Sequence, residues 1–416
     1  MRRGALAAAF VAAFLAACRP AGPPPIVGTG LPDEEPMVRV GIAVNAAQVV
    51  VSAPSSFEIG QPGRRPEVVA SGGERWVFTA EGAGRLMASG PGGRRAGPFD
   101  APVRVRTRND SPVEIDGSPY RGGALVRAAG AGRVTAINVL ALEDYLLGVV
   151  PLEIGARPAA EIEAVKAQAV AARTYAVSHL GGRESLGFDF YATVADQVYG
   201  GSSSEDAVVS RAVRETRGEI LTYEGSPILA YYHSTCGGRT AAIDEVWTSP
   251  PIPYLVSVSD RVGEDGEAYY CEISNRFRWS ERWSADELRE MLTESLELRG
   301  APIRHVEAVE VTGRTPSGRA EALRIVADGR SFVVAPPDSI RRILRPESGR
   351  MLNSSLFVLD RHADGGAPVE WVAHGGGWGH GIGMCQMGAI GRVRAGQNYR
   401  RILATYYRGT DIERLY

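Results

Sequence analysis

The residues best suited to chemistry stand together near the C-terminus, in the stretch HGGGWGHGIGMCQMGA from His374 to Ala389. Histidine and cysteine side by side suggest a metal site or a nucleophile, and Trp378 offers a flat apolar face of the kind that sugar sites use. The seven glycines indicate a backbone that passes close to a ligand or to another segment. We interpret the stretch as the wall of a binding groove in which Trp378, His380 and Gln386 contact the ligand. The alternative is a tight structural turn around a buried tryptophan.

A second reactive group lies in YYHSTCGG, where His233 and Cys236 are spaced as in many zinc sites. With His380 and Cys385 they would complete four ligands. The other interpretation makes His233 and Ser234 polar contacts to a bound substrate. A His–Cys nucleophile pair is the third interpretation, and we consider it the least suitable.

Glu153, in VVPLEIG, is the candidate for proton transfer. Its neighbours in sequence are apolar, and burial among them would favour the protonated acid. Such an acid can protonate a poor leaving oxygen near neutral pH. Glu153 is also expected on a connection just before a helix, where catalytic groups often lie. It could instead be a helix-entry carboxylate or an ion-pair partner of a basic residue on that helix.

The helix that would position Glu153 is predicted from about Pro158 to Leu180, since no glycine or proline interrupts the stretch and apolar residues recur at three- and four-residue spacing. Lys166, Gln168 and Arg173 are its polar members. They could bind sugar hydroxyls or carboxylates, or they could bond a neighbouring loop and hold Glu153 in place.

The DQVYGG stretch follows this helix and adds Gln197, for hydrogen bonding, and Tyr199, for stacking on a sugar. Tyr199 suits a hydrophobic core equally well. Residues 37 to about 142 show strand patterns without a helical period, with turns predicted at Asn45 and at residues 129–132. Further strands and short helices are predicted after residue 218, so the fold class is α+β, mainly β, with one alanine-rich helix lining a groove.

The N-terminus has the pattern of an export signal, with a basic start, a short apolar run at residues 5–17 and LAAC before Cys18. We expect Cys18 to be lipidated, and residues 19–36, rich in proline and glycine, to form an extended tether. A net charge of −2 over 416 residues gives no reason to expect nucleic acid as a partner. Export to an oxidising compartment allows one disulfide, for which we favour Cys236 with Cys271 without excluding Cys385.

Several blocks occur in one order that resembles the SpoIID/LytB family of sporulation proteins and amidase enhancers. They are LEDYLLGVVPLEIG, AVKAQAVAARTYAV, DQVYGG, ETRGEILTY, AYYHSTCGGRT, SGRAEALRI, LNSSLFVL, GGWGHGIGMCQMGA and ILATYYRGT, between about Val113 and Tyr416. The resemblance implies action on peptidoglycan by a lytic transglycosylase, with Glu153 at the position of the catalytic glutamate. The LAAC pattern at Cys18 separately indicates a lipid-anchored protein of the cell envelope, and the absence of Asp after Cys18 makes an outer-membrane address plausible in a two-membrane cell.

Two departures from the family bear on metals. Some members carry zinc ligands just before QVY, but DFYATVADQVYGG has neither histidine nor cysteine, and the family usually has serine at Cys385. We therefore expect no cofactor. The resemblance leaves a glycan-binding enhancer of a cell-wall amidase as the main alternative, and a zinc amidase as the third. The predicted organisation is a signal peptide (1–18), a tether (19–36), a β-rich region (37–112) and a SpoIID/LytB-like domain (113–416).

Overall fold

The computed structural model describes residues 34–81, 84–100, 102–130, 132–263, 265–298, 300–346, 348–362 and 369–416. The predicted signal peptide, Cys18 and most of the predicted tether lie outside these ranges. Within the described residues, no helix has the length and apolar character needed to cross a membrane.

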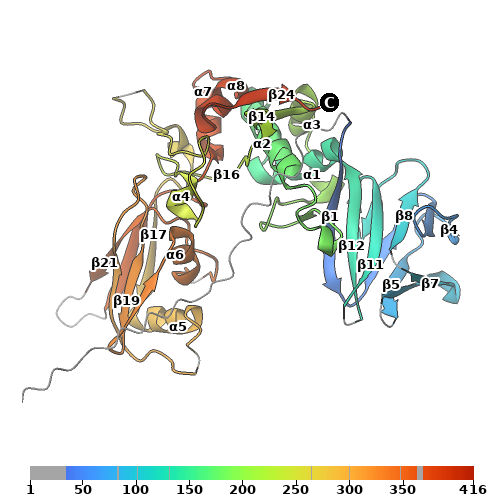
Figure 1. Ribbon diagram of the computed structural model, residues 1–416, viewed down its shortest axis with the longest axis horizontal. Coiled ribbons are helices and arrows are strands. Elements are labelled where there is room, and N and C mark those ends of the chain that lie inside the picture. Colours follow the sequence, from blue (N-terminus) through green and yellow to red (C-terminus); the bar gives the residue numbers. More distant parts are fainter. Residues whose placement is uncertain are drawn as a thin grey trace, which may run out of the picture. The chain divides into compact units, whose positions relative to one another are not determined.

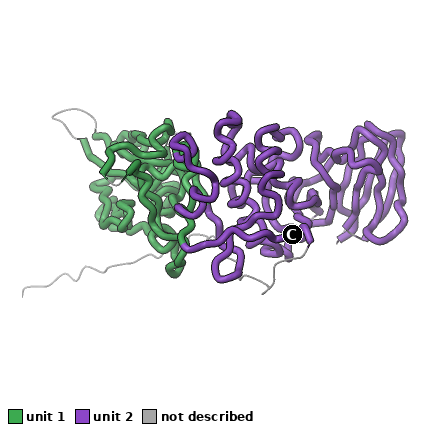
Figure 2. Tube along the Cα trace, turned by 90° about the horizontal axis from the view of Figure 1, so that it is seen from above, with its two compact units in different colours: residues 1–22, 232–391, 406–408 green, residues 23–231, 392–405, 409–416 purple. Residues whose placement is uncertain are grey.

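The chain divides into two compact units (Figure 2). Unit 1 comprises Tyr232–Gly391 and Tyr406–Arg408. Unit 2 comprises the described residues up to Tyr231, with Arg392–Thr405 and Gly409–Tyr416. The predicted boundary at residues 112 and 113 therefore falls inside unit 2. The described residues form 24 strands and 8 α-helices, which confirms the predicted α+β fold, mainly β.

Two sheets form the first part of unit 2, and the buried side chains alternate along their strands as a half-buried strand requires. The first sheet has the order β13-β1-β12-β11-β8-β3-β4 and the second β10-β9-β2-β5-β6-β7. Their bounds are β1 Met37–Ala46, β2 Val49–Ser52, β3 Phe57–Gly60, β4 Val68–Ala70, β5 Trp76–Glu81, β6 Arg85–Ser89, β7 Arg95–Asp100, β8 Val103–Thr107, β9 Val113–Ile115, β10 Ser118–Tyr120, β11 Gly123–Ala129, β12 Arg133–Ala141 and β13 Phe190–Tyr191.

The predicted hairpin around residues 129–132 is confirmed, because β11 and β12 pair antiparallel through it. The predicted turn at Asn45 is wrong. Asn45 lies inside β1, with φ of 58°, at a place where the pairing with β12 shifts register. An asparagine tolerates this left-handed conformation, and β1 ends one residue later, at Ala46.

Three helices of unit 2 follow β12 (Figure 1): α1 (Leu142–Ile154), α2 (Ile162–His179) and α3 (Ala207–Glu215). The sequence did not predict α1, because Gly148 and Pro151 argue against a helix. Pro151 falls in the last turn of α1. A Cβ at Gly148 would lie 2.5 Å from the ring of Tyr199, so the glycine is what lets that ring pack on the helix.

The alanine-rich helix is α2, and it is the centre of unit 2. It packs against α1, α3 and strand β14 (Glu219–Tyr223), and most of its side chains are buried. Alanine is small enough to let three neighbours approach so closely. The sequence predicted a helix with one apolar face that lines a groove. This prediction is wrong in that α2 is enclosed on most sides. Strands β15 (Ser226–Pro227) and β24 (Asp411–Arg414) flank β14 in a further sheet.

Unit 1 contains two three-stranded sheets and a core to which α5 and α6 contribute (Figure 1). One sheet has the order β17-β22-β21 and the other β18-β19-β20. The bounds are β17 Trp279–Ser284, β18 Val306–Val311, β19 Leu323–Ala327, β20 Arg330–Val334, β21 Phe357–His362, β22 Glu370–Gly375, α5 Ala285–Ser295 and α6 Pro337–Ile343. Strands β18, β19 and β20 and helices α5 and α6 confirm the strands and short helices predicted after residue 218.

The remaining elements are short. They are β16 (Tyr232–His233), β23 (Met384–Cys385), α4 (Ile243–Val246), α7 (Gln386–Arg394), α8 (Tyr399–Tyr406) and the 3-10 helices η1 Pro91–Gly93, η2 Ala159–Glu161, η3 Glu184–Leu186, η4 Gly201–Ser204 and η5 Tyr270–Ile273. Helix α8 is another of the short helices predicted after residue 218.

Candidate functional site

Glu153 lies in the last turn of α1, not on a connection before a helix as predicted. Its side chain is partly buried. The backbone N–H of Val198 donates a hydrogen bond of 2.9 Å to its Oε1. Val150 on α1 is fully buried, whereas Leu152 is 45% exposed, so the carboxyl group lies at the edge of the core. A proton donor that must meet a polymer needs such a position, since a fully enclosed acid could not reach it.

Gln197 and Tyr199 hold the segment that carries the Val198 amide. Both are buried. The hydroxyl of Tyr145 donates to Gln197 Oε1 at 3.2 Å, and Gln197 Nε2 donates to the carbonyl of Ala172 at 3.3 Å. The Tyr199 hydroxyl donates to Asn138 Oδ1 at 2.8 Å. These bonds fix the segment to α1, α2 and β12, and so they orient the Glu153 carboxylate indirectly.

Asp196 is a second carboxyl in this segment, and the sequence analysis missed it. Its side chain is 2% exposed and pairs with Arg183 at 2.9 Å, while the Tyr191 N–H donates to Oδ2 at 2.8 Å. Burial raises the pKa of Asp196, and the bonds from Tyr191 and Arg183 offset only part of that effect. Its place beside Gln197 was the only signal in the sequence, and it did not reveal the burial.

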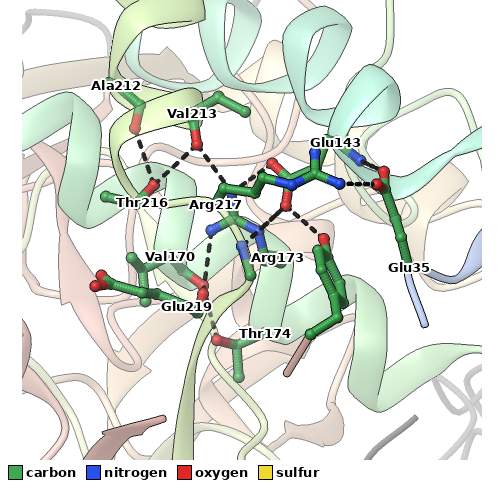
Figure 3. A network of polar contacts seen from close by, with 12 residues as sticks. Glu35, Glu143, Val170, Arg173, Thr174, Ala212, Val213, Thr216, Arg217 and Glu219 are labelled. Carbon is green, nitrogen blue, oxygen red and sulfur yellow. Dashed lines mark hydrogen bonds and ion pairs between the residues drawn. The ribbon is translucent and has the colours of Figure 1, made fainter. Parts of the chain in front are cut away.

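Arg173 is fully buried in an ion pair (Figure 3). Its Nε and Nη2 donate to the two carboxylate oxygens of Glu143 at 2.8 and 2.7 Å, and Nη1 donates to the carbonyl of Glu219 at 3.1 Å. Glu143 also accepts from the Gly218 N–H and the Tyr416 hydroxyl. Burial alone would raise the pKa of Glu143, but Arg173 outweighs it and the pKa is lowered. The pair therefore joins α1, α2, β14 and the C-terminus.

Lys166 and Gln168 also face the protein. The Nζ of Lys166 lies 2.8 Å from carboxylates of both Glu163 and Glu215, which links α2 to α3. Burial would lower the pKa of Lys166, but these two carboxylates raise it. Gln168 is fully buried. Of the two roles considered for the polar residues of α2, the geometry favours that of holding neighbouring elements.

In unit 1, the strand pair β16–β23 brings the two reactive stretches of the sequence together. Tyr232 pairs with Met384 and His233 with Cys385, in parallel. Next to this pair, Thr235 and Trp378 exchange backbone hydrogen bonds of 3.0 and 2.7 Å.

The glycines of the C-terminal stretch serve the close approach of one backbone to another. Gly377 has φ of 86°, and a Cβ there would lie 2.6 Å from the carbonyl oxygen of Thr235. Of the two reasons considered for these glycines, the structure shows contact with another segment.

His380 is held in one neutral tautomer by the backbone. Its Nδ1 accepts from the Ile382 N–H at 3.0 Å, so Nε2 carries the proton and donates to the carbonyl of Tyr232 at 2.9 Å. Burial lowers the pKa of His380 to about 4. His233 is buried beside it, with Nδ1 3.1 Å from the carbonyl of Ile382. Both rings are therefore neutral near pH 7.

Ser234, Trp378 and Gln386 differ in their access to solvent. Trp378 is 41% exposed, and the guanidinium of Arg276 lies over its ring at 4.8 Å from the centroid. Ser234 is partly buried, and Gln386 is buried at the start of α7. Of these predicted contacts, Trp378 offers the largest surface for a ligand.

Unit 1 also has a cleft of about 710 Å³ that the sequence analysis did not find. Arg278, Arg314, His374 and Trp279 line it, together with Gly375 and neighbouring residues of β21 and β22. An indole face beside two guanidinium groups suits a sugar that bears a carboxylate. His374, the first residue of the glycine-rich stretch, was the only sequence signal for this cleft.

The four ligands considered for zinc do not come together. His233 and His380 turn ring nitrogens to backbone groups. Cys236 and Cys385 instead group with Asp260 and Cys271, and the ligand atoms of these four side chains all lie within 4.8 Å of one another. The three described cysteines are free thiols, and 3.4 Å separates the Sγ atoms of Cys236 and Cys271, the pair favoured for a disulfide.

Comparison with known proteins gives the family. The family model described as stage II sporulation protein (SpoIID) matches residues 130–223. The chain is similar to stage II sporulation protein D of Bacillus subtilis, with 31% identity over 293 residues, 66% of this chain and 75% of that protein. The chain belongs to the SpoIID family.

The chain is also similar to two proteins that carry other names. The amidase enhancer of Bacillus subtilis is 31% identical over 301 residues, 64% of this chain but 40% of that protein. An uncharacterized protein of Brachyspira hyodysenteriae is 33% identical over 277 residues, 66% of this chain and 67% of that protein. A second family model, a domain of unknown function (DUF8618), matches residues 241–383.

The SpoIID match coincides with the helical part of unit 2. It includes α1, α2 and β14, and hence Glu153, the polar residues of α2 and the segment of Gln197. Trp378 and His380 fall in the second match, within unit 1. Cys385 lies beyond both matches.

Proposed function

We propose that this SpoIID-family protein acts on peptidoglycan and cleaves its MurNAc–GlcNAc strands by lytic transglycosylation, with Glu153 as the single acid and base. The observation that carries the proposal is the place of Glu153 inside the SpoIID match. It stands at the edge of a helix-packed core, and the Val198 N–H orients its carboxylate. The names of the relatives, which include an amidase enhancer, support a role in the cell wall.

The reaction needs one carboxyl group and two proton transfers. The protonated Glu153 gives its proton to the glycosidic oxygen as the bond from that oxygen to C1 of muramic acid breaks. The resulting carboxylate then takes the proton of the C6 hydroxyl of the same sugar, and that oxygen bonds to C1. The product ends in a 1,6-anhydro ring, no water is consumed, and Glu153 is protonated again. The proposed reaction draws on no cofactor.

The other predicted site residues take two roles in this proposal. Trp378, Ser234 and the cleft lined by Arg278 and Arg314 are contacts for the glycan and its carboxylates. The buried and partly buried side chains act by positioning, and they are Lys166, Gln168, Arg173, Gln197, Tyr199, His233, His380 and Gln386. Arg173 keeps α1 against α2, and Gln197 keeps the Val198 amide on Glu153.

The second candidate function is enhancement of a cell-wall amidase without cleavage, which the similarity to the amidase enhancer favours. Glu153 would then be a polar contact only. Mass spectrometry of purified glycan strands after incubation with the protein separates the functions. Anhydro ends, lighter than reducing ends by one water, support transglycosylation. Released stem peptides would mean an amidase, and unchanged strands together with stimulation of a separate amidase would mean an enhancer.

Replacing Trp378 by alanine should weaken binding of glycan strands by about 1–3 kcal/mol, because a partly exposed stacking face is lost. Binding isotherms with uncleaved strands would measure the effect. Val333→Ala removes an exposed apolar side chain elsewhere in unit 1 and should bind like the wild type. Circular dichroism checks that both variants fold. Equal affinity of a folded Trp378→Ala variant would rule out the stacking role.

The envelope location is proposed to depend on a lipid at Cys18. Replacing Cys18 by serine removes the thiol that would carry the lipid, so the variant should leave the membrane fraction or stay unprocessed. Fractionation followed by immunoblotting measures this. A variant that partitions into membranes like the wild type would exclude lipidation at Cys18. Fractionation of inner from outer membrane tests the outer-membrane address.

A further inference from the structure

Three cysteines and an aspartate converge in unit 1, beside the β16–β23 pair, and none of the four has a role in the proposed cleavage or glycan binding. Cys236 follows β16, Cys271 lies in η5, Cys385 ends β23, and Asp260 lies in the loop between the first two cysteines. All four are fully buried, and their ligand atoms lie within 4.8 Å of one another. Segments up to 149 residues apart in the chain thus meet at one point.

The spacing of the ligand atoms is that of a tetrahedral metal site. Zinc bonds to thiolate sulphur at about 2.3 Å, which places two sulphurs on one ion roughly 3.8 Å apart. The Sγ atoms of Cys236 and Cys271 are 3.4 Å apart, and Cys236 Sγ is 3.7 Å from Asp260 Oδ2. A set of three thiolates and one carboxylate closes a four-coordinate site without an open position.

The surrounding groups orient the ligands as outer groups do in metal sites. The hydroxyl of Tyr406 donates to Asp260 Oδ1 at 2.7 Å, and the Cys236 thiol lies against the other oxygen, Oδ2. Backbone N–H groups of Cys236 and Gly388 both point at Cys385 Sγ, each at 3.2 Å. Two N–H donors aimed at one buried sulphur are the arrangement that outer groups make around a thiolate ligand.

Gly388 supplies the room for this arrangement. A Cβ at Gly388 would lie 2.2 Å from the Tyr406 hydroxyl and 2.6 Å from Asp260 Oδ2. Any other residue at this position would therefore push the tyrosine or the carboxylate out of place.

A buried cation nearby points to a negative charge at the cluster. Arg319 is 1% exposed, and its guanidinium donates to the Cys236 carbonyl, the Arg239 carbonyl and the Ser317 hydroxyl. Within the described ranges it forms no ion pair with a carboxylate. A buried guanidinium favours negative charge close by, and a zinc ion with three thiolates and a carboxylate would carry a net negative charge there.

We propose that Cys236, Asp260, Cys271 and Cys385 bind one structural zinc ion, which ties the β16–β23 pair to η5 in unit 1. Binding releases the thiol protons to solvent and leaves the oxidation state of zinc and sulphur unchanged. The ion has no open position for substrate, so its role is to hold the fold. The competing state is a disulfide between Cys236 and Cys271. It would leave Cys385 as a buried thiol that accepts from the N–H groups of Cys236 and Gly388 and donates to the carbonyl of Ser234.

The test is the metal content of the full-length chain, purified without chelators and analysed by inductively coupled plasma mass spectrometry. We expect about one zinc per chain in the wild type and at least a ~10-fold lower occupancy in Cys271→Ser, which loses one of four ligands. His380→Gln is the matched control, because it removes a ligand of the competing histidine set. It should keep the zinc.

A second measurement covers the case in which Cys271→Ser fails to fold. Cobalt(II) loaded into the wild-type chain should give thiolate-to-cobalt charge-transfer bands and the d–d absorption of tetrahedral coordination. The cysteines of unit 1 should react with an alkylating reagent only after chelation. Metal-free protein with Cys236 joined to Cys271 in a non-reducing peptide map, and no uptake of zinc or cobalt after reduction, would overturn the proposal. Loss of zinc in His380→Gln together with full zinc in Cys271→Ser would also overturn it. None of these readouts depends on glycan cleavage.

Discussion

Glu153→Gln is expected to fold, to bind glycan strands, and to cleave them at least ~10²-fold more slowly than the wild type. Glutamine keeps the size of the side chain, and its Oε1 can still accept from the Val198 N–H. It cannot deliver or accept the proton, and the loss corresponds to the lower end of what general acid–base catalysis supplies. Initial rates of anhydro-end formation measure the effect.

The matched control for this variant is Glu224→Gln. Glu224 belongs to the same unit and lies exposed in the turn between β14 and β15, so the same substitution should leave the rate unchanged. If Glu153→Gln cleaves as fast as this control, another carboxyl must supply the proton. Asp196, which is buried in the neighbouring segment and has a raised pKa, is then the next residue to replace.

Arg173→Met is expected to lower the free energy of unfolding of unit 2 by about 3–5 kcal/mol. Methionine fills the space but leaves the carboxylate of Glu143 buried without its cation, and breaking a buried pair from one side has a cost of this order. Denaturant unfolding followed by circular dichroism measures the loss.

Arg211→Met provides the comparison for Arg173→Met. Arg211 is an arginine of the same unit, and it pairs with Glu215 on the surface with 61% of its side chain exposed. An exposed pair contributes about 0–1 kcal/mol, so this variant should be nearly as stable as the wild type. Equal losses of unfolding free energy in the two variants would show that the buried network in Figure 3 stabilises the unit no more than an exposed ion pair does.

The β-rich half of unit 2 could be predicted because its signals are local. Alternating apolar residues and the turn at residues 129–132 are properties of neighbouring residues, and β11 and β12 follow them. Helix α1 could not be predicted in this way. Gly148 and Pro151 argue against a helix locally, and only the ring of Tyr199, about fifty residues later in the chain, shows why a glycine stands there.

In the candidate site, too, the sequence revealed the features that depend on neighbouring residues and missed those that depend on contacts between distant segments. The sequence singled out Glu153, and the family match now includes it. The sequence could not reveal that Arg173 pairs with Glu143. An arginine on an alanine-rich helix has the same local pattern whether it faces solvent or a buried carboxylate. Asp260 and Cys271 carry no ligand signature in sequence. Their spacing follows no zinc motif, and only the meeting of η5, β23 and the loop after β16 places them together.

The most direct test of the proposed chemistry is cleavage of purified glycan strands in water enriched in heavy oxygen. Transglycosylation closes the C6 oxygen of the sugar onto C1, so the new ends should contain no oxygen from the solvent and should be lighter than reducing ends by one water. Hydrolysis would place a solvent oxygen on every new end. Reducing ends that carry the heavy isotope, formed by the wild type and absent with Glu153→Gln, would contradict the account even though Glu153 would remain catalytic.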